Sequence, residues 1–348
     1  MFVTSRHEND KVLVHEIPIP EPKKDQLLVK ITAASLCHSD LMMSRRPSGL
    51  GPLTIGHEGV GVVSKLHPSS EGHGFRIGDT IGMICIIDAC YECEGCRVHG
   101  SFCVGSRKGG AKIQGLAAHG YFAEFAVVDW RSAILLPGSL PVERMSPLFC
   151  AGITSFHAVD KCSLEPSQWL AIVGCGGLGQ LAVRYAKAMG LKICCLDVND
   201  QVLETASQNG ADAIFNTQKD PKFVRKIRQL TQSRGCHAAV VFSDAEAAYT
   251  TAQRILTFDG LLMVVGMPDT PLKFPAFAIS TNLIRVKGAS NGTAAELKKA
   301  VDFMAKHHIV PDVQFRPLEE MPQMWWEMAN GKAKGKLGVS FIDAKSRL

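Results

Sequence analysis

The stretch WLAIVGCGGLG, residues 169–179, decides the fold because it joins an apolar run to a glycine-rich turn. Gly174, Gly176 and Gly179 satisfy the pattern G-x-G-x-x-G. The bare pattern is weak evidence in a chain with 32 glycines, but here a strand pattern precedes it and a helix pattern follows at once. We therefore predict a dinucleotide-binding loop at this point. Its candidate cofactor-binding residues are Gly174, Gly176, Gly177, Leu178 and Gly179.

An acidic residue completes this fingerprint. The next strand pattern, KICCL, ends on Asp197, 18 residues after Gly179. Gly174 would make the tight turn, Gly176 would let backbone amides approach a pyrophosphate, and Gly179 would let the helix pack closely on the strand. The Asp197 carboxylate would bind the adenosine ribose hydroxyls and repel a 2′-phosphate, which favours NAD over NADP. The alternative is a glycine-rich packing turn followed by a surface aspartate.

Two kinds of pattern divide the chain. Before about Leu148, short β-branched runs such as QLLVKITAASL and EGVGVVSKL alternate with Gly and Pro, which predicts a β-rich domain. Beyond that point, strand patterns are separated by longer helical ones, which is the βαβ rhythm of a parallel sheet. From about Ala294, one helix pattern precedes the strand-like run LGVSFI, and we expect this tail to return to the first domain. A length of 348 residues also favours two domains.

Composition and charge exclude several classes of protein. Hydrophobic residues make up 46% of the chain and charged residues 20%, so it is neither disordered nor a small disulfide-stabilised protein. The Lys and Arg residues behind the formal charge of +5 are scattered, which gives no support to nucleic-acid binding. No apolar run is long enough to span a membrane, and the start of the chain lacks a signal-peptide pattern. We therefore expect a cytoplasmic protein without a membrane partner.

The twelve cysteines are an unusual number for an intracellular protein. Four of them form the spacing C-x2-C-x2-C-x6-C, and the others are dispersed. Four thiolates this close can wrap one zinc ion tetrahedrally, and Gly95, Gly100 and Gly105 would supply the turns of the loop. We predict a closed, structural zinc site, with a redox-active thiol cluster or a loop that has lost its metal as the alternatives. The four predicted ligands are Cys90, Cys93, Cys96 and Cys103.

A second group of potential metal ligands is spread along the chain before the glycine loop. Cys37 lies in CHSD, His57 and Glu58 lie in GHEG, and Cys150 lies in PLFCAGITSFHA. Two Cys and one His are a suitable ligand set for a catalytic zinc with an open fourth position. Taken singly, each residue is more often a buried thiol or a core histidine. The hypothesis of a catalytic zinc site therefore rests on these residues taken together, not on any one of them.

With these motifs in place, the sequence resembles the zinc-dependent alcohol dehydrogenases of the medium-chain dehydrogenase/reductase superfamily. The blocks CHSDL, PLTIGHEGVGVV, CYECEGCRVHGSFC, IVGCGGLG and GKAKGKLGVSF look like family blocks in the family's order, and the resemblance covers nearly the whole chain. It implies an α/β protein with a GroES-like β-barrel catalytic domain, residues 1–150 completed by residues 291–348. Residues 151–290 would form the Rossmann NAD-binding domain, with the active site between the two domains. A homodimer or homotetramer is expected.

The resemblance also implies a role for each matching residue. Ser39 would relay the hydroxyl proton while zinc polarises the substrate oxygen and hydride passes between the substrate carbon and NAD. His38 would face the pyrophosphate, and Thr154 would line the nicotinamide side. Zinc, two ions per chain, and NAD are the implied cofactors, and an alcohol or carbonyl compound is the implied partner. The catalytic zinc ligands would be Cys37, His57 and Cys150, with Glu58 beside them as a neighbour or occasional ligand.

Four positions depart from the family pattern. The spacing between Cys96 and Cys103 is one residue shorter than usual, so the loop must be tighter or distorted. The GHE signature of the family ends on a glycine, and His67 stands at that position here. Cys85 replaces a common Trp that narrows the substrate pocket, which favours medium or bulky apolar alcohols. Met42 occupies the usual position of the His that passes the proton to solvent, and a thioether cannot do this.

Three functions are compatible with these residues. The first is an NAD-dependent zinc alcohol dehydrogenase or carbonyl reductase. The second is an NAD(P)H-dependent reductase of C=C or C=N bonds on the same scaffold, because those reactions need no alcohol proton carried through a His. The third is a non-catalytic protein that binds NAD and zinc, against which the complete catalytic ligand set argues.

Overall fold

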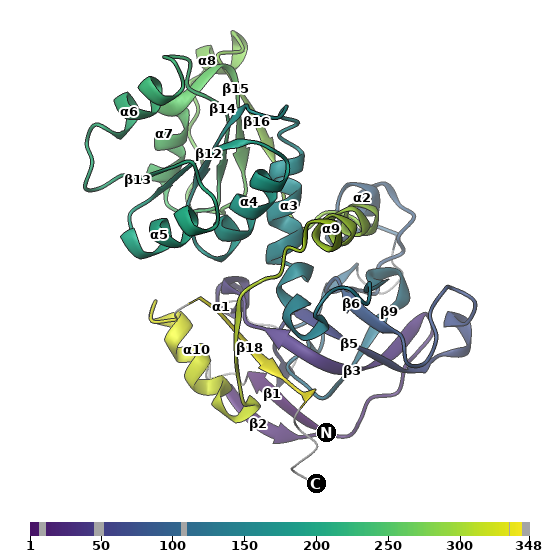
Figure 1. Cartoon of the computed structure of the whole chain (residues 1–348). Coiled ribbons are helices and arrows are strands. Elements are labelled where there is room, and N and C mark those ends of the chain that lie inside the picture. The colour runs from purple at the N-terminus through teal and green to yellow at the C-terminus, as the bar shows by residue number, and fades with distance from the viewer. Residues whose placement is uncertain (7–11, 45–51, 106–109, 334, 343–348) are drawn as a thin grey trace. The chain divides into compact units, whose positions relative to one another are not determined.

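The computed structural model describes residues 1–6, 12–44, 52–105, 110–333 and 335–342. The chain forms two units, one made of residues 1–151 and 292–348 and the other of residues 152–291 (Figure 1). Each is considered by itself below. Among the described residues, no helix is both long and apolar enough to cross a membrane.

The first unit is built around the long strand β3 (Gln26–Ser35), which is buried along most of its length. The start of β3 pairs antiparallel with β9, its end pairs antiparallel with β18 from the C-terminal tail, and β5 pairs along its other side. The seven-stranded sheet has the order β10-β6-β5-β3-β18-β17, with β9 joined to β3. The remaining strands form a sheet of order β2-β1-β4 and a β7-β8 pair.

The other strands of this unit are β1 (Phe2–Arg6), β2 (Val12–Glu16), β4 (Leu53–Thr54), β5 (Glu58–Leu66), β6 (Thr80–Met83), β7 (Ile86–Ile87), β8 (Lys112–Ile113), β9 (Phe125–Asp129), β10 (Ala133–Leu135), β17 (Val313–Arg316) and β18 (Lys336–Ser340). Its helices are α1 (His38–Ser44), α2 (Glu94–Val98), α9 (Ala294–His307) and α10 (Met321–Ala329). Apolar residues of the large sheet and of α10 share one core, so the tail is part of this unit.

The second unit is a six-stranded parallel sheet of order β13-β12-β11-β14-β15-β16. This is the order of a doubly wound nucleotide-binding sheet, as predicted. One apolar core joins α3, α4 and α5 to one face of the sheet, and a second joins α6 and α7 to the other (Figure 1). The strands are β11 (Trp169–Val173), β12 (Lys192–Asp197), β13 (Ala213–Asn216), β14 (Cys236–Val241), β15 (Leu256–Val264) and β16 (Ile284–Gly288). The helices are α3 (Ala151–Asp160), α4 (Gly177–Ala188), α5 (Asp200–Gln208), α6 (Phe223–Leu230), α7 (Glu246–Ile255) and α8 (Ala276–Ser280).

Candidate functional site

The predicted catalytic ligands come together in the first unit. Cys37 follows β3, His57 immediately precedes β5, and Glu58 is the first residue of β5. Because Ser35 at the end of β3 pairs directly with Glu58, the two strands bring these residues side by side. Cys150 joins them from the end of the 3-10 helix at Val142–Phe149. One potential ligand atom from each of Cys37, His57, Glu58 and Cys150 lies within 4.8 Å of the others, and all four residues are buried.

The spacing and protonation of the two thiols suit a divalent metal. The Sγ atoms of Cys37 and Cys150 lie 4.0 Å apart, and thiolates bound to one zinc ion at 2.3 Å lie about 3.8 Å apart. His57 Nε2 lies 3.3 Å from Cys150 Sγ. The hydrogen bond from Cys150 lowers the pKa of Cys37 well below its ordinary value, and the same contact, with burial, raises the pKa of Cys150. This contact favours the thiolate form of Cys37, which is the form that binds a metal ion.

Asp40 in the first turn of α1 orients His57. Its Oδ1 lies 2.6 Å from His57 Nδ1, and its Oδ2 accepts the backbone N–H of Cys37 at 2.9 Å. Burial opposes a charged imidazole, but the Asp40 carboxylate outweighs burial and raises the pKa of His57. When the His57 Nδ1–H is donated to Asp40, Nε2 is left with its lone pair toward Cys150, as a metal ligand requires.

Glu58 is held by several donors on the other side of the cluster. Lys336 Nζ, on the first residue of β18, lies 2.8 Å from its Oε1 and 2.7 Å from its Oε2. Ser35 donates its hydroxyl to Oε2, and the N–H of Ala151 donates to Oε1 at 3.4 Å. Burial raises the pKa of Glu58 to about 7, although the Lys336 ammonium opposes this. Burial alone would lower the pKa of Lys336, but Glu58 and Cys37 raise it, so Lys336 stays charged.

The four cysteines of the second cluster also converge. Their Sγ atoms lie within 4.8 Å of one another, and those of Cys90 and Cys96 are 3.9 Å apart, which fits a tetrahedral zinc site. Backbone N–H groups, first that of Cys96, lower the pKa of Cys93 to about 6. Burial raises the pKa of Cys96 to about 12. The shortened spacing before Cys103 has therefore not separated the thiols.

The glycines of this loop act differently from the prediction. Gly95, Gly100 and Gly105 do not have positive φ angles, so none is needed to form a left-handed turn. At Gly105 and Gly95 space is the constraint instead, because a Cβ on Gly105 would lie 2.8 Å from Cys90 Sγ and one on Gly95 would lie 1.9 Å from the Phe102 carbonyl oxygen.

The glycine loop of the second unit joins β11 to α4. Gly174 has φ +91°, and a Cβ on Gly179 would lie 2.3 Å from the Gly174 carbonyl oxygen. A Cβ on Gly176 or on Gly177, which begins α4, would meet no atom within 4 Å, so the surface over the start of α4 is open. The first amides of a helix have no partner within it, and these can face an anionic group.

Asp197 ends β12 beside this loop. Its Oδ2 accepts the Cys175 N–H at 2.7 Å, and its Oδ1 accepts the N–H groups of Val198 at 2.7 Å and Asn199 at 3.0 Å. These bonds fix the carboxylate next to the glycine turn, and Oδ2, which accepts one N–H, keeps a lone pair for a further donor.

The other predicted residues lie as follows. The Ser39 hydroxyl is half-buried, 3.8 Å from Cys37 Sγ, and His38 is exposed at the start of α1. Met42 is half-buried in α1, and Cys85 is 2% exposed in the core of the first unit. Thr154 is buried in α3 of the second unit, where its hydroxyl donates to Asn291 Oδ1 at 2.9 Å.

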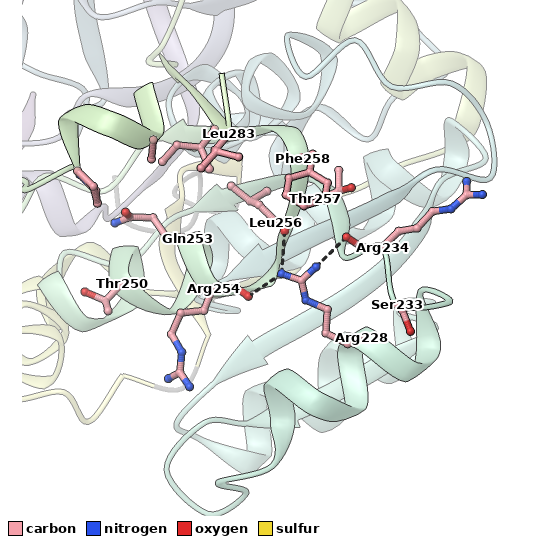
Figure 2. Close-up of a pocket in the computed structure, with 13 residues that line it drawn as sticks. Arg228, Ser233, Arg234, Thr250, Gln253, Arg254, Leu256, Thr257, Phe258 and Leu283 are labelled. Atoms are coloured by element: carbon pink, nitrogen blue, oxygen red, sulfur yellow. Dashed lines mark hydrogen bonds between the residues drawn. The ribbon is translucent and has the colours of Figure 1, made fainter. Parts of the chain in front are cut away.

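A separate cavity of about 600 Å³ lies at the starts of β15 and β16, the end of the sheet opposite the glycine loop (Figure 2). Arg228 there donates hydrogen bonds to the backbone carbonyls of Arg234, Arg254 and Leu256. The side chains of Arg234 and Arg254 extend away from each other in Figure 2. The lining residues include no thiol, imidazole or carboxylate, so this cavity offers no metal ligands.

Comparison with known proteins shows the family of the chain. The zinc-binding dehydrogenase family matches residues 177–306, and the alcohol dehydrogenase GroES-like domain matches residues 23–138. An alcohol dehydrogenase from Geobacillus stearothermophilus is 33% identical over 329 residues, which cover 93% of this chain and 94% of that protein. The chain belongs to the zinc-type alcohol dehydrogenases of the medium-chain dehydrogenase/reductase superfamily.

Solved structures of alcohol dehydrogenases share the fold. That of the enzyme from Aeropyrum pernix has a TM-score of 0.85 at 28% identity and covers 98% of this chain and 100% of its own. That of the enzyme from Thermus sp. ATN1 has a TM-score of 0.86 at 24% identity and covers 98% and 99%. The predicted α/β architecture, a GroES-like domain with a Rossmann domain, is confirmed.

Two residues of this alcohol dehydrogenase site were missed by sequence reasoning. Asp40 could have been found from the sequence, because it lies three residues after the candidate ligand Cys37 in CHSD. The structure places it in the first turn of α1. The contact of Lys336 with Glu58 could not have been predicted in this way, since the two residues are 278 positions apart in the sequence.

Replacing Asp40 with Asn is expected to weaken metal binding at the catalytic site by about 10- to 100-fold, because the amide no longer anchors His57 as a charged acceptor. The measurement is zinc retention against a graded chelator, with Asp129→Asn, which removes a buried carboxylate far along the chain that pairs with Arg131, as the matched control. Equal zinc retention in the two variants would contradict the orienting role of Asp40.

Proposed function

We propose that this alcohol dehydrogenase-type oxidoreductase uses zinc and NAD to transfer a hydride between NAD(H) and an alcohol/carbonyl pair. The observation that carries the proposal is the convergence of Cys37, His57 and Cys150 on one buried point, with the Ser39 hydroxyl beside it. Three protein ligands leave a fourth position open, which is typical of a catalytic rather than a structural zinc. The four-cysteine cluster would hold the second, structural zinc.

The division of work follows from the side chains. Zinc would polarise the oxygen of an alcohol or carbonyl group, and NAD would take up or release the hydride. During oxidation, Ser39 relays the hydroxyl proton: its oxygen accepts that proton while its own proton passes on to solvent. During reduction, the relay runs in the opposite direction. Asp40 keeps His57 in the ligating tautomer. In the second unit, the amides at the start of α4 and the Asp197 carboxylate would bind the nucleotide. The family resemblance implies that His38, a residue of the first unit, contacts its pyrophosphate and that Thr154 of the second unit contacts its nicotinamide.

The preference for NAD rests on the charges around Asp197. Asp200 is three residues further along, and Lys219 is ion-paired with it. A 2′-phosphate would meet the Asp197 carboxylate, whereas ribose hydroxyls can donate to this oriented acceptor.

Asp197→Ser is expected to reduce the ratio of NADPH to NADH dissociation constants by at least about tenfold, the equivalent of 1.4 kcal/mol, because it removes both the ribose acceptor and the repulsion. Fluorescence titration of both reduced cofactors measures this. Asp212→Ser, which alters a carboxylate of the same unit that pairs with Lys187 and Lys192, is the control. Comparable affinities for the two cofactors in the unaltered protein would refute the NAD assignment.

The proposed substrates are medium or bulky apolar alcohols, since Cys85 is much smaller than the indole common at this position. Efficiency is expected to rise along a series of primary alcohols by up to about fourfold per CH2, from ~0.8 kcal/mol for each buried methylene. Steady-state kcat/KM values for the series test this. If ethanol is the best substrate, the packed neighbours of Cys85, which is 2% exposed, already fill the space.

A reductase of C=C or C=N bonds is the competing function, and Met42 favours it. The thioether at this position of α1 cannot exchange the proton of an alcohol with solvent. Such reductions do not require that exchange.

The deciding experiment measures metal content and NAD reduction with a panel of alcohols. About two zinc ions per chain and alcohol-dependent NADH formation are expected. One zinc or none in freshly purified protein contradicts the two-site assignment. Turnover of C=C or C=N substrates without alcohol oxidation supports the competing function, and zinc and NADH binding without turnover of either class supports a non-catalytic protein.

A further inference from the structure

We propose that Tyr91 is a positioning residue that anchors the four-cysteine loop to the body of the first unit and so holds its thiols in place for a metal ion. Tyr91 lies between two of the predicted ligands, Cys90 and Cys93. The inference rests on the proposed function only in taking the four-cysteine cluster as a metal site.

The backbone at Tyr91 favours glycine. Its φ angle is +62°, in the left-handed region that glycine adopts freely and a bulky side chain does not. A tyrosine keeps this conformation only where other contacts offset the strain. The contacts of the Tyr91 side chain therefore show what holds this point of the loop.

The Tyr91 hydroxyl bonds outside the loop. It lies 3.1 Å from the carbonyl oxygen of Ile86, the first residue of β7, and 2.6 Å from the Ser132 hydroxyl. Ser132 in turn donates to the same Ile86 carbonyl at 2.7 Å. By contrast, the N–H groups of Cys90 and Cys93 donate to sulfurs of the cluster itself, at 3.3 and 3.4 Å. The Tyr91 hydroxyl thus connects the loop to two other segments of the first unit.

The Tyr91 ring has a partner in one of these segments. The guanidinium carbon of Arg131 lies 4.6 Å from the ring centroid, within the range of a cation–π interaction. Arg131 and Ser132 both belong to the 3-10 helix Trp130–Ser132, so the ring and the hydroxyl contact one element. This helix leads directly into β10, which pairs with β6 in the large sheet. The Tyr91 side chain therefore fixes the loop to that sheet.

Such an anchor affects metal binding through the order of the loop. Four thiolates can wrap one zinc ion only when the loop holds them together, and ordering a free loop opposes binding. Contacts that order the loop before the metal arrives remove this opposing entropy and strengthen binding. We therefore expect retention of the metal by the four-cysteine cluster to depend on Tyr91.

The test follows zinc release from the full chain to a chromophoric chelator. Tyr91→Gly relaxes the backbone and removes the anchor, and these two changes have opposite effects on the loop. Zinc release is expected to quicken by about tenfold, because a hydrogen bond and a cation–π contact are lost together. If backbone strain were the larger effect, release would slow instead.

Alkylation with iodoacetamide during release locates the site. Mass spectrometry is expected to show faster modification of the four-cysteine cluster in Tyr91→Gly, while Cys37 and Cys150 are modified as in the unaltered protein. A general loss of stability would expose the thiols of both clusters alike. Selective modification therefore separates positioning from a merely structural role.

Two further variants remove parts of the anchor. Tyr91→Phe keeps the ring and removes the hydroxyl, so zinc release is expected to quicken by about three- to tenfold. Ser132→Ala alters no residue of the loop and is expected to have a smaller effect, because the Tyr91 hydroxyl keeps its carbonyl acceptor. Tyr249→Phe removes a hydroxyl that donates to the Gly266 carbonyl in the second unit. It is the matched control and is expected to release zinc as the unaltered protein does.

Zinc release from Tyr91→Gly that is no faster than from the unaltered protein would overturn the proposal, as would equal release from Tyr91→Phe and Tyr249→Phe. The second comparison remains decisive if Tyr91→Gly does not fold. These measurements need neither nucleotide nor substrate, so failure to oxidise any alcohol counts against the proposed function and not against this role of Tyr91.

Absence of zinc from the four-cysteine cluster of the unaltered protein would contradict the two-zinc assignment. The anchor is then tested by itself through tryptic cleavage after Arg97, which is exposed in α2. Cleavage is expected to be faster in Tyr91→Phe than in Tyr249→Phe, and equal rates would overturn the proposal.

Discussion

Replacing Cys37 with Ala is expected to lower kcat/KM for NAD-linked alcohol oxidation by at least about 10³-fold, because the metal contributes several kcal/mol to the transition state. Of the three proposed zinc ligands, His57 and Cys150 would remain, and Cys150 would lose the hydrogen bond that it shares with Cys37. Zinc content is expected to fall from about two ions per chain to about one, since the four-cysteine cluster is separate. Elemental analysis and steady-state kinetics measure the two effects.

The matched control is Cys162→Ala, which removes another buried thiol outside both clusters. It is expected to keep both zinc ions and the activity. If Cys37→Ala retains two zinc ions, or loses zinc without losing activity, the catalytic metal is not held where we place it.

Ser39→Ala is expected to lower kcat by about 10²- to 10⁴-fold, because a positioned group that transfers the hydroxyl proton contributes this much. The Ser39 hydroxyl lies beside the cluster without being one of its converging ligands, so zinc content and NADH affinity are expected to stay unchanged. Stopped-flow measurement of NADH formation follows the step directly.

Ser39→Thr is the conservative control, since it keeps a hydroxyl at the same position and is expected to keep most of the activity. Full activity in Ser39→Ala would mean that another group carries the proton, and would favour a reaction in which no alcohol proton moves.

Local features of the fold could be predicted from the sequence, because each of them depends on a short stretch of residues. The turn at Gly174 requires a positive φ angle, and Gly179 must lack a Cβ where α4 crosses the glycine turn. The strand that ends at Asp197 is an apolar run bounded by polar residues. Each of these constraints acts within a few residues, so a pattern in the chain is enough to predict it.

The sequence analysis assigned the wrong role to the glycines of the four-cysteine loop, which it expected to supply turns. A glycine in a sequence does not distinguish freedom of φ from lack of space. At Gly105 the constraint is the Cys90 sulfur, a contact that arises only when the loop has folded around the cluster.

The sequence by itself determined which side chains can bind metal, because ligand chemistry belongs to residue type: Cys37, His57 and Cys150 are suitable donors wherever they meet. Tertiary structure decided what surrounds them. The β3–β5 pairing brings Glu58 beside the cluster, and the β3–β18 pairing brings Lys336 to Glu58 across 278 residues. A pair such as Glu58 and Lys336 cannot be predicted from a periodic pattern in the sequence. The two residues pair because a carboxylate buried by the fold needs a cation beside it.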